Sequence, residues 1–182
     1  MSEQDDEVLV SRCLGGDRSA FEALVERYQG PLFNLALRMT QRYADAEDIT
    51  QSAFLKAYEG LSSFKPGRKF FSWLYRIAVN ETLNFLRGKR LHEPLSEDIQ
   101  AEDADGIREL ARDEASARIQ EALMELSVEY RTVVVLKHLQ ELPYADISQI
   151  LDIPEKTVKS RLFSARMQMR AVLTQKGVRL HD

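Results

Sequence analysis

Residues 142–172 read LPYADISQILDIPEKTVKSRLFSARMQMRAV, and this stretch decides the fold of the C-terminal part of the chain. Its first segment, 142–151, starts a short helix at Pro143 and places apolar residues at helical spacing. Residues 152–154 then form a turn that ends in Pro154, whose fixed backbone angle suits the start of another helix. A short helix, a turn and a long helix together predict a helix-turn-helix.

The long second helix of this motif has one apolar side and one basic side. Val158, Leu162 and Ala165 recur at the spacing of a buried stripe. The opposite side carries cations, a serine and an aromatic ring, which suit phosphates, base edges and thymine methyl groups in the major groove. A solvated basic helix in a bundle is the alternative, but an aromatic residue on a wet face lacks a packing reason. We therefore predict that duplex DNA is read by Lys156, Lys159, Ser160, Arg161, Phe163 and Arg166.

The composition predicts an all-α protein without a metal or cofactor site. The 182 residues are 44% apolar, and the 8 glycines and 5 prolines are too few for a protein built from many tight turns. Cys13 is the single cysteine, so no internal disulfide forms, and the three histidines show no metal-ligand spacing. Neither a signal peptide nor an apolar run of membrane-spanning length is present, which predicts a cytoplasmic protein without membrane insertion of its own.

The net charge of −4 is divided into blocks of opposite sign. Residues 1–63 carry −5, 64–92 carry +6, 93–129 carry −9, and 130–182 carry +4. Two basic blocks separated by an acidic one favour two nucleic-acid contacts, although each block could also be a solvated face.

The apolar periodicity predicts two small helical domains. An N-terminal four-helix domain covers residues 1–92, an acidic, flexible linker covers 93–114, and the helix-turn-helix domain covers 115–182. The four N-terminal helices are expected at about 5–14, 17–39, 44–61 and 70–87, with breaks at Gly15-Gly16 and Pro66-Gly67 and a kink at Gly30-Pro31.

Three local features of these helices carry separate predictions. Asp5 or Asp6 is expected to cap the first helix and Asp17 the second. Residues 131–139 favour a strand locally, but the chain offers no partner strand, so a buried helix is predicted. Buried stripes are expected to include Tyr58 in the third helix and Ile119 in the helix after the linker.

A second candidate nucleic-acid face lies on the fourth helix and the loop before it. Residues 73, 76, 80, 84 and 87 fall within roughly 80° of one another on a helix. Amides can bond exposed base edges, rings can stack on bases and cations can follow the backbone, so single-stranded nucleic acid is the expected ligand. The tryptophan could instead belong to the core, and the asparagines could be ordinary surface. The expected contacts are Phe64, Lys65, Arg68, Lys69, Trp73, Arg76, Asn80, Asn84 and Arg87.

Three motifs along the chain resemble the extracytoplasmic-function (ECF) group of bacterial sigma factors, the promoter-specificity subunits of RNA polymerase. They are DAEDITQSAFLKAY at 45–58, FSWLYRIAVN at 71–80 and TVKSRLFSAR at 157–166. The resemblance covers nearly the whole chain. It implies a non-enzymatic initiation factor that binds core RNA polymerase through its beta and beta-prime subunits, directs it to specific promoters and promotes DNA melting.

The resemblance also implies a role for each face. The third helix would bind polymerase through Asp45, Asp48, Gln51, Ser52 and Leu55. The 64–69 loop and the fourth helix would capture the melted minus-10 element, and the last helix would read the minus-35 element as duplex. The acidic linker would run through the positively lined channels of polymerase, and an anti-sigma factor would hold the protein inactive.

The chain departs from the family pattern at three positions, and two other functions compete with the sigma-factor hypothesis. Ser52 stands where a glutamate is common, and Asp152 and Lys156 replace usual glycines. A stand-alone repressor would use the helix-turn-helix but would leave the fourth helix unexplained. A nuclease or nucleotide-binding enzyme would need a glycine-rich phosphate loop or a catalytic grouping, and neither is present in the sequence.

Overall fold

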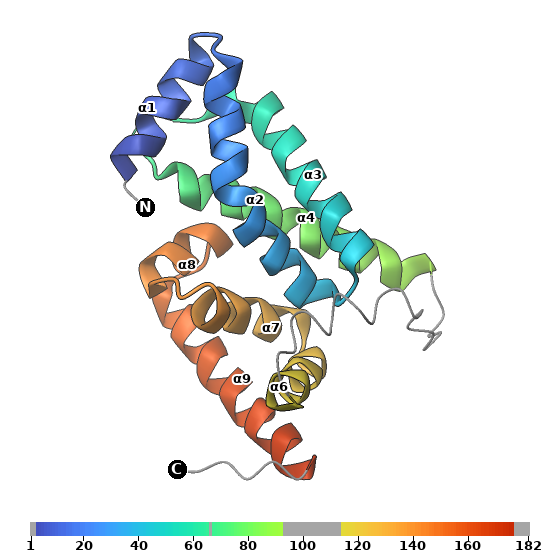
Figure 1. The fold of residues 1–182 in the computed structure, drawn as a ribbon. Coiled ribbons are helices and arrows are strands. Elements are labelled where there is room, and N and C mark those ends of the chain that lie inside the picture. The colour runs from blue at the N-terminus through green and yellow to red at the C-terminus, as the bar shows by residue number, and fades with distance from the viewer. Residues whose placement is uncertain (1–2, 66, 93–113, 177–182) are drawn as a thin grey trace.

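The computed structural model describes residues 3–65, 67–92 and 114–176, and every regular element in these ranges is helical (Figure 1). The all-α prediction is therefore confirmed. The elements are α1 (Glu3–Leu14), α2 (Arg18–Thr40), α3 (Tyr43–Gly60), the short η1 (Leu61–Ser63), α4 (Phe70–His92), α6 (Glu114–Met124), α7 (Val128–Val134), η2 (Val135–Leu139), α8 (Tyr144–Leu151) and α9 (Glu155–Gln175).

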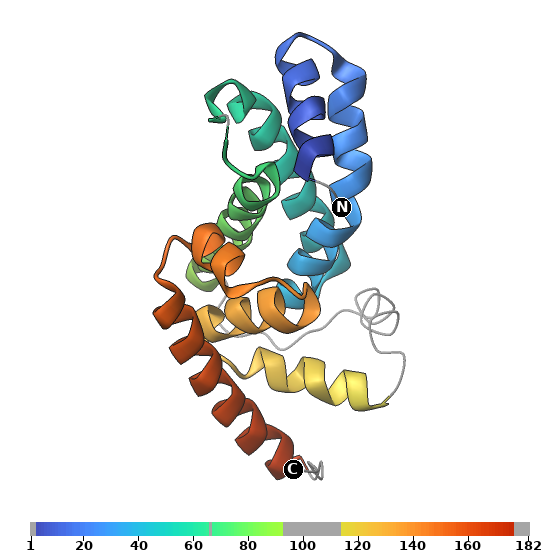
Figure 2. The ribbon, with the colours of Figure 1, turned by 90° about the vertical axis from the view of Figure 1, so that its left-hand side faces the viewer.

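The helices form two units that lie against each other in both views (Figures 1 and 2). The N-terminal unit consists of α1 to α4, and the C-terminal unit consists of α6 to α9. The predicted linker falls on residues 93–113, which lie outside the described residues, and α6 begins at Glu114. Thus two helical units are present, as the sequence predicts.

The start of α2 follows the predicted capping, but the start of α1 does not. The Asp17 side chain accepts a hydrogen bond from the Ser19 amide at 3.0 Å, which satisfies a free donor at the N-terminus of α2. The prediction that Asp5 or Asp6 caps the first helix is wrong, because α1 already begins at Glu3. Asp6 is buried instead, where its carboxylate accepts hydrogen bonds from the side chains of Arg27 and Tyr28. Asp6 therefore ties α1 to α2.

Small residues let α2 and α3 approach closely. Ala46, Ala53 and Ala57 on α3 are fully buried, so at these positions α3 presents only methyl groups and backbone to its neighbours. The helical segment of α2 continues through Pro31 without interruption.

Two predictions of buried residues are wrong. Tyr58 is 52% exposed and Ile119 is 45% exposed, because each helix buries a narrower part of its circumference than its apolar residues span.

Residues 131–139, whose valines favour a strand locally, are helical, as predicted. Residues 128–134 form α7, and the helix widens into the π-helical turn η2 before it ends. Val133, Val134, Val135 and Leu136 are all buried, so tertiary packing outweighs the local strand preference of the valines.

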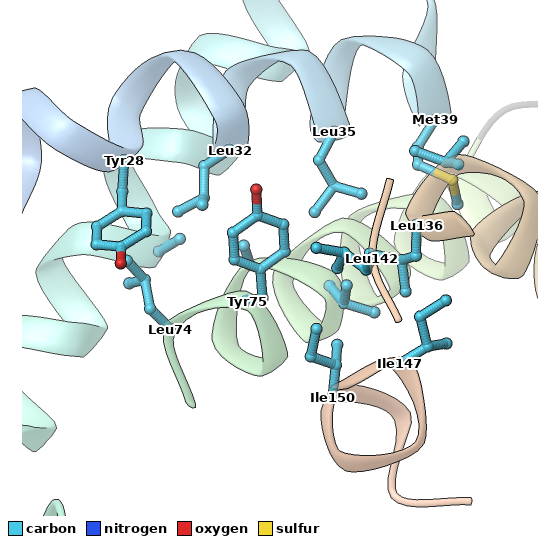
Figure 3. Packing of buried hydrophobic residues seen from close by; sticks show 14 of the residues in the cluster. Tyr28, Leu32, Leu35, Met39, Leu74, Tyr75, Leu136, Leu142, Ile147 and Ile150 are labelled. Atoms are coloured by element: carbon cyan, nitrogen blue, oxygen red, sulfur yellow. The ribbon is translucent and has the colours of Figure 1, made fainter. Parts of the chain in front are cut away.

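The two units share one apolar core, which the sequence does not predict (Figure 3). Leu35 and Met39 of α2 and Tyr75 of α4 are buried in the same cluster as residues of η2 and α8. The residues contributed by the C-terminal unit, and drawn with them in Figure 3, are Leu136, Leu142, Ile147 and Ile150.

One buried cation joins the units at the C-terminal end of α2. The Arg131 guanidinium donates to the carbonyl oxygen of Met39 at 2.8 Å, across the boundary between the units. It also donates to two carbonyl oxygens at the end of α6, those of Leu123 at 3.2 Å and Met124 at 2.9 Å, and to that of Leu126, just after the helix, at 3.3 Å. Helix-end carbonyls lack partners within their own helix, so Arg131 satisfies acceptors of two helices at once.

Replacing Arg131 by alanine is expected to lower the free energy of unfolding by about 2–4 kcal/mol, because several buried carbonyls lose their donor. Urea denaturation followed by circular dichroism measures this change. Arg18→Ala, which removes an exposed arginine at the start of α2, serves as the control and is expected to change stability by less than about 0.5 kcal/mol. Equal stability losses for the two variants would contradict the bridging role.

Candidate functional site

The exposed side of α3 forms the first candidate surface. Asp48, Gln51 and Leu55 are exposed and lie one turn apart on one side of the helix, and the Leu55 side chain is 64% exposed. We call these three residues the α3 face. An isolated exposed leucine is ordinary, but its neighbours make this position part of a larger apolar surface.

That larger surface is a groove between α2 and α3 with a volume of about 470 Å³. Phe21 and Tyr58 form one wall, with their ring centroids 5.0 Å apart at a steep interplanar angle. The sequence prediction missed both residues as surface candidates, because their spacing fits a buried stripe. One feature of the sequence could have revealed this surface. The apolar residues of α3 span a wider part of the helix circumference than one neighbouring helix can cover. The groove is lined by Phe21, Val25, Gln29, Thr50, Gln51, Phe54, Leu55 and Tyr58.

Two of the residues predicted for this surface point towards other parts of the chain. Asp45 is half-buried and forms ion pairs with Arg42 at 3.6 Å and Lys89 at 3.4 Å. Ser52 donates a hydrogen bond to the Glu81 carboxylate of α4 at 2.8 Å. The structure therefore brings Asp48, Gln51 and Leu55 together at the surface, whereas Asp45 and Ser52 connect α3 to its neighbours.

The second candidate surface is formed by α4 and the preceding loop. Lys65, Arg68, Lys69, Asn80, Asn84 and Arg87 are exposed, and Trp73 and Arg76 are half-buried. We call these eight residues the α4 face. Gly67 in the loop has φ of 82°, a left-handed conformation that favours glycine.

Phe64 is the exception among the predicted residues of this surface. It is only 8% exposed and packs edge-on against Phe70 and Trp73, with ring centroids 5.8 and 5.4 Å apart. The prediction that Phe64 itself meets nucleic acid is therefore corrected: its ring is held inside the aromatic cluster that supports Trp73.

A cavity of about 480 Å³ lies where the α4 face meets the C-terminal end of α8. Arg76 donates a hydrogen bond to the carbonyl oxygen of Gln149 at 2.6 Å and forms an ion pair with Asp152 at 3.2 Å. Ser72, one of its lining residues, has a buried hydroxyl without a hydrogen-bond partner among the described residues. The cavity is lined by Gly67, Arg68, Lys69, Ser72, Trp73, Arg76, Gln149 and Asp152.

The third candidate surface lies on α9. Val158, Leu162 and Ala165 are buried, and the predicted opposite side is exposed, with Phe163 at 68%. Of the residues predicted to read DNA, Lys156, Lys159, Ser160, Phe163 and Arg166 are exposed, whereas Arg161 flanks this side and is half-buried. It lines a cleft of about 350 Å³ that also contains Arg87 of the α4 face. We call the six predicted residues the α9 face.

The described residues contain neither a candidate metal site nor a candidate membrane-spanning helix. Within 3–65, 67–92 and 114–176, His, Cys, Asp and Glu side chains form no group of three or more that could hold a metal ion. None of the helices described is long and apolar enough to cross a membrane.

Two family models match the chain, sigma-70 region 2 over residues 24–92 and sigma-70 region 4 over residues 116–169. The first match lies within the N-terminal unit and the second within the C-terminal unit. The chain belongs to the ECF group of RNA polymerase sigma factors.

Curated relatives align with this sigma factor over nearly its whole length. The RNA polymerase sigma-H factor of Pseudomonas aeruginosa is 35% identical, with 91% of this chain and 92% of that protein covered. The ECF sigma-E factor of Haemophilus influenzae is 38% identical, with 91% and 94% covered. SigW of Bacillus subtilis is 38% identical, with 87% and 91% covered.

Solved structures share the fold. CnrH, solved in complex with the cytosolic domain of CnrY, superposes with a TM-score of 0.74 at 25% identity over 94% of this chain and 98% of that one. The sigma factor RpoE of Bartonella quintana, solved with the anti-sigma factor NepR, has a TM-score of 0.64 at 21% identity over 85% and 96%. The match to CnrH includes both units.

Two residues that the sequence prediction missed hold cations of the α9 face in this sigma factor. The Tyr144 ring lies 5.4 Å from Lys159 Nζ and 4.8 Å from Lys137 Nζ, within the range of cation–π attraction. His138 Nε2 lies 3.3 Å from Arg166 Nη2 and accepts its hydrogen bond when neutral. Partial burial, Arg166 and Lys137 lower the pKa of His138, which favours this neutral form.

We expect Tyr144→Leu to weaken binding to a labelled promoter duplex about two- to fivefold, because Lys159 loses the ring that orients it. Tyr144→Phe keeps the aromatic face and serves as the matched control, with affinity close to wild type. Fluorescence anisotropy titrations at one fixed salt concentration compare the variants. Identical losses for Leu and Phe would show that the hydroxyl, and not the ring, matters.

Proposed function

We propose that this sigma factor binds core RNA polymerase through the α3 face, captures the melted minus-10 strand with the α4 face and reads the minus-35 element with the α9 face. One observation carries the proposal: three exposed faces of different chemistry lie within the two segments matched by the sigma-70 models. Binding, without a catalytic group, is then sufficient for the function.

The α3 face suits a protein partner better than a nucleic acid. Its exposed leucine lies beside an apolar groove, and Asp48 adds a negative charge that would repel phosphates. Aromatic and aliphatic side chains in a groove are the usual anchors of protein interfaces. We assign this face to core RNA polymerase, with its beta and beta-prime subunits as the partners.

The α4 face suits unpaired DNA strands. The Asn80 and Asn84 amides can bond base edges that are free only after melting, and Lys65 and Arg68 can follow the backbone. Unstacking a base costs a few kcal/mol, and stacking and phosphate contacts on the captured strand offset this cost. Capture of the strand would therefore promote melting without covalent chemistry.

The α9 face suits the major groove of duplex DNA. An α-helix fits this groove, and Arg and Lys recognise guanine edges there while apolar groups contact the thymine methyl. Lys156 stands where the family usually has glycine, and its exposed position adds one cation near the start of the reading helix. Each phosphate contact makes binding more sensitive to salt.

An anti-sigma factor is the expected regulator. The Bartonella quintana protein was solved with an anti-sigma factor, and CnrH was solved with the cytosolic domain of CnrY. We infer that a comparable protein partner binds this chain and competes with polymerase.

Run-off transcription with core RNA polymerase on a promoter library tests the proposal as a whole. Adding this sigma factor is expected to produce new transcription start sites that core polymerase alone does not use. Specific DNA binding without any new start site would favour the repressor alternative instead.

Single substitutions should separate the two DNA readers. Asn80→Ala is expected to reduce open-complex formation, measured with a permanganate footprint, about tenfold while minus-35 duplex binding stays near wild type. Arg161→Ala is expected to do the reverse, with a loss of about 1–3 kcal/mol in duplex binding. Asn34→Ala and Arg18→Ala change exposed residues of the same types on α2 and serve as controls. Equal losses in both assays for both variants would contradict the division.

The polymerase contact has its own test in Leu55→Ala. We expect affinity for core polymerase to fall at least about fivefold, because a central apolar anchor is removed. Leu14→Ala removes a leucine of α1 that is also exposed, and it is expected to leave the affinity unchanged. Competition binding against a labelled sigma factor gives the values, and matched affinities for the two variants would remove Leu55 from the interface.

A further inference from the structure

Carboxylates of the C-terminal unit form ion pairs with cations of the α4 face. Asp152, in the turn of the helix-turn-helix, forms an ion pair with Arg76 at 3.2 Å. Asp146 of α8 forms an ion pair with Lys69 at 3.4 Å. Arg76 also donates to the backbone carbonyl of Gln149. Two cations expected to meet DNA phosphates thus meet negative groups of the same chain.

These ion pairs lie beside a contact that is otherwise apolar and hydrogen-bonded, and Figure 3 shows its apolar residues. Tyr75 donates to the Gln140 side chain at 2.9 Å, and the Gln140 amide donates to the Pro31 carbonyl at 3.2 Å. Ile147 and Ile150 of α8 are fully or almost fully buried in the shared core. The α8 helix therefore docks on the N-terminal unit as a surface with an apolar centre and a charged edge.

The docked arrangement differs from one that could read both promoter elements. Minus-10 and minus-35 positions are about 25 base pairs apart, which is about 85 Å of straight duplex at 3.4 Å per pair. Here α9 starts three residues after α8, and the turn between them, at Asp152, lines the same cavity as Trp73 and Arg76. The two DNA-reading faces must separate before both elements can be bound.

We propose that the helix-turn-helix unit masks the α4 face in cis, with Asp146 and Asp152 taking the place of DNA phosphates. This inference rests on the assignment of the α4 face to minus-10 DNA. The φ of 56° at Asp152 shows that this residue holds the left-handed turn conformation while its carboxylate pairs with Arg76. The turn therefore combines a structural role with an acidic contact that glycine could not make.

Single-molecule fluorescence transfer on the full chain tests the docking without DNA. Dyes are attached to cysteines that replace the exposed Ser62 and Gln168, in a Cys13→Ser background. Combining Asp146→Asn with Asp152→Asn is expected to raise the ratio of open to closed molecules about three- to tenfold, and added salt should act in the same direction. Asparagine tolerates the left-handed turn, so this variant keeps the backbone of the helix-turn-helix.

Two further variants separate a specific contact from a general charge effect. Glu141→Gln removes one negative charge from an exposed residue just before α8 and is expected to leave the open fraction unchanged. Asp146→Lys should open the protein, and adding Lys69→Asp should restore the closed population because the ion pair is rebuilt with reversed polarity. Failure of this rescue, together with unchanged distances in the double asparagine variant, would overturn the proposal.

Binding of a single-stranded minus-10 oligonucleotide, taken from a promoter found by run-off transcription, links the docking to function. The double asparagine variant is expected to bind about three- to tenfold more tightly than wild type, and Glu141→Gln only marginally more tightly. The same gain for both would indicate charge alone and would reject masking. Opening without any transcription activity would instead preserve the docking and reject the assigned function.

Discussion

The docking of η2 and α8 on α2 and α4 is the constraint on which the rest of the structure depends. Helix α2 buries side chains on more than one side: Ala36 and Leu37 pack in a small cluster with Ala46 and Ile49 of α3, and Leu35 belongs to the core shared with the C-terminal unit. At its end, the Met39 carbonyl accepts a hydrogen bond from the buried Arg131. Because these contacts lie on one helix, the position of each unit affects the other.

This arrangement divides the functional faces into two kinds. The α3 face and its groove belong to the N-terminal unit, and the groove is lined by residues of α2 and α3 alone. Part of the α4 face lies at the edge of the docking contact, where Arg76 has protein partners already. Under the roles proposed above, the polymerase contact is available in the docked state, while access to part of the proposed DNA-binding surface requires separation of the units.

Family membership and physical chemistry support each other in this chain. The departures from the family pattern have physical consequences: Ser52 binds Glu81 of α4, and Asp152 binds Arg76. Both residues therefore make contacts within the chain, one between two helices of the N-terminal unit and one between the two units.

The sequence by itself determined the helices, the two units and the basic α9 face, because periodicity and capping act over a few residues. The burial of Val158 and Leu162 and the exposure of Phe163 follow from spacing on one helix. Only the tertiary structure decided that Phe64 is buried, that Tyr58 lines a groove and that Arg76 meets Asp152. These outcomes depend on which neighbouring helix covers each side chain, and Arg76 and Asp152 lie in different matched segments. Spacing along one helix contains no information about such a distant partner.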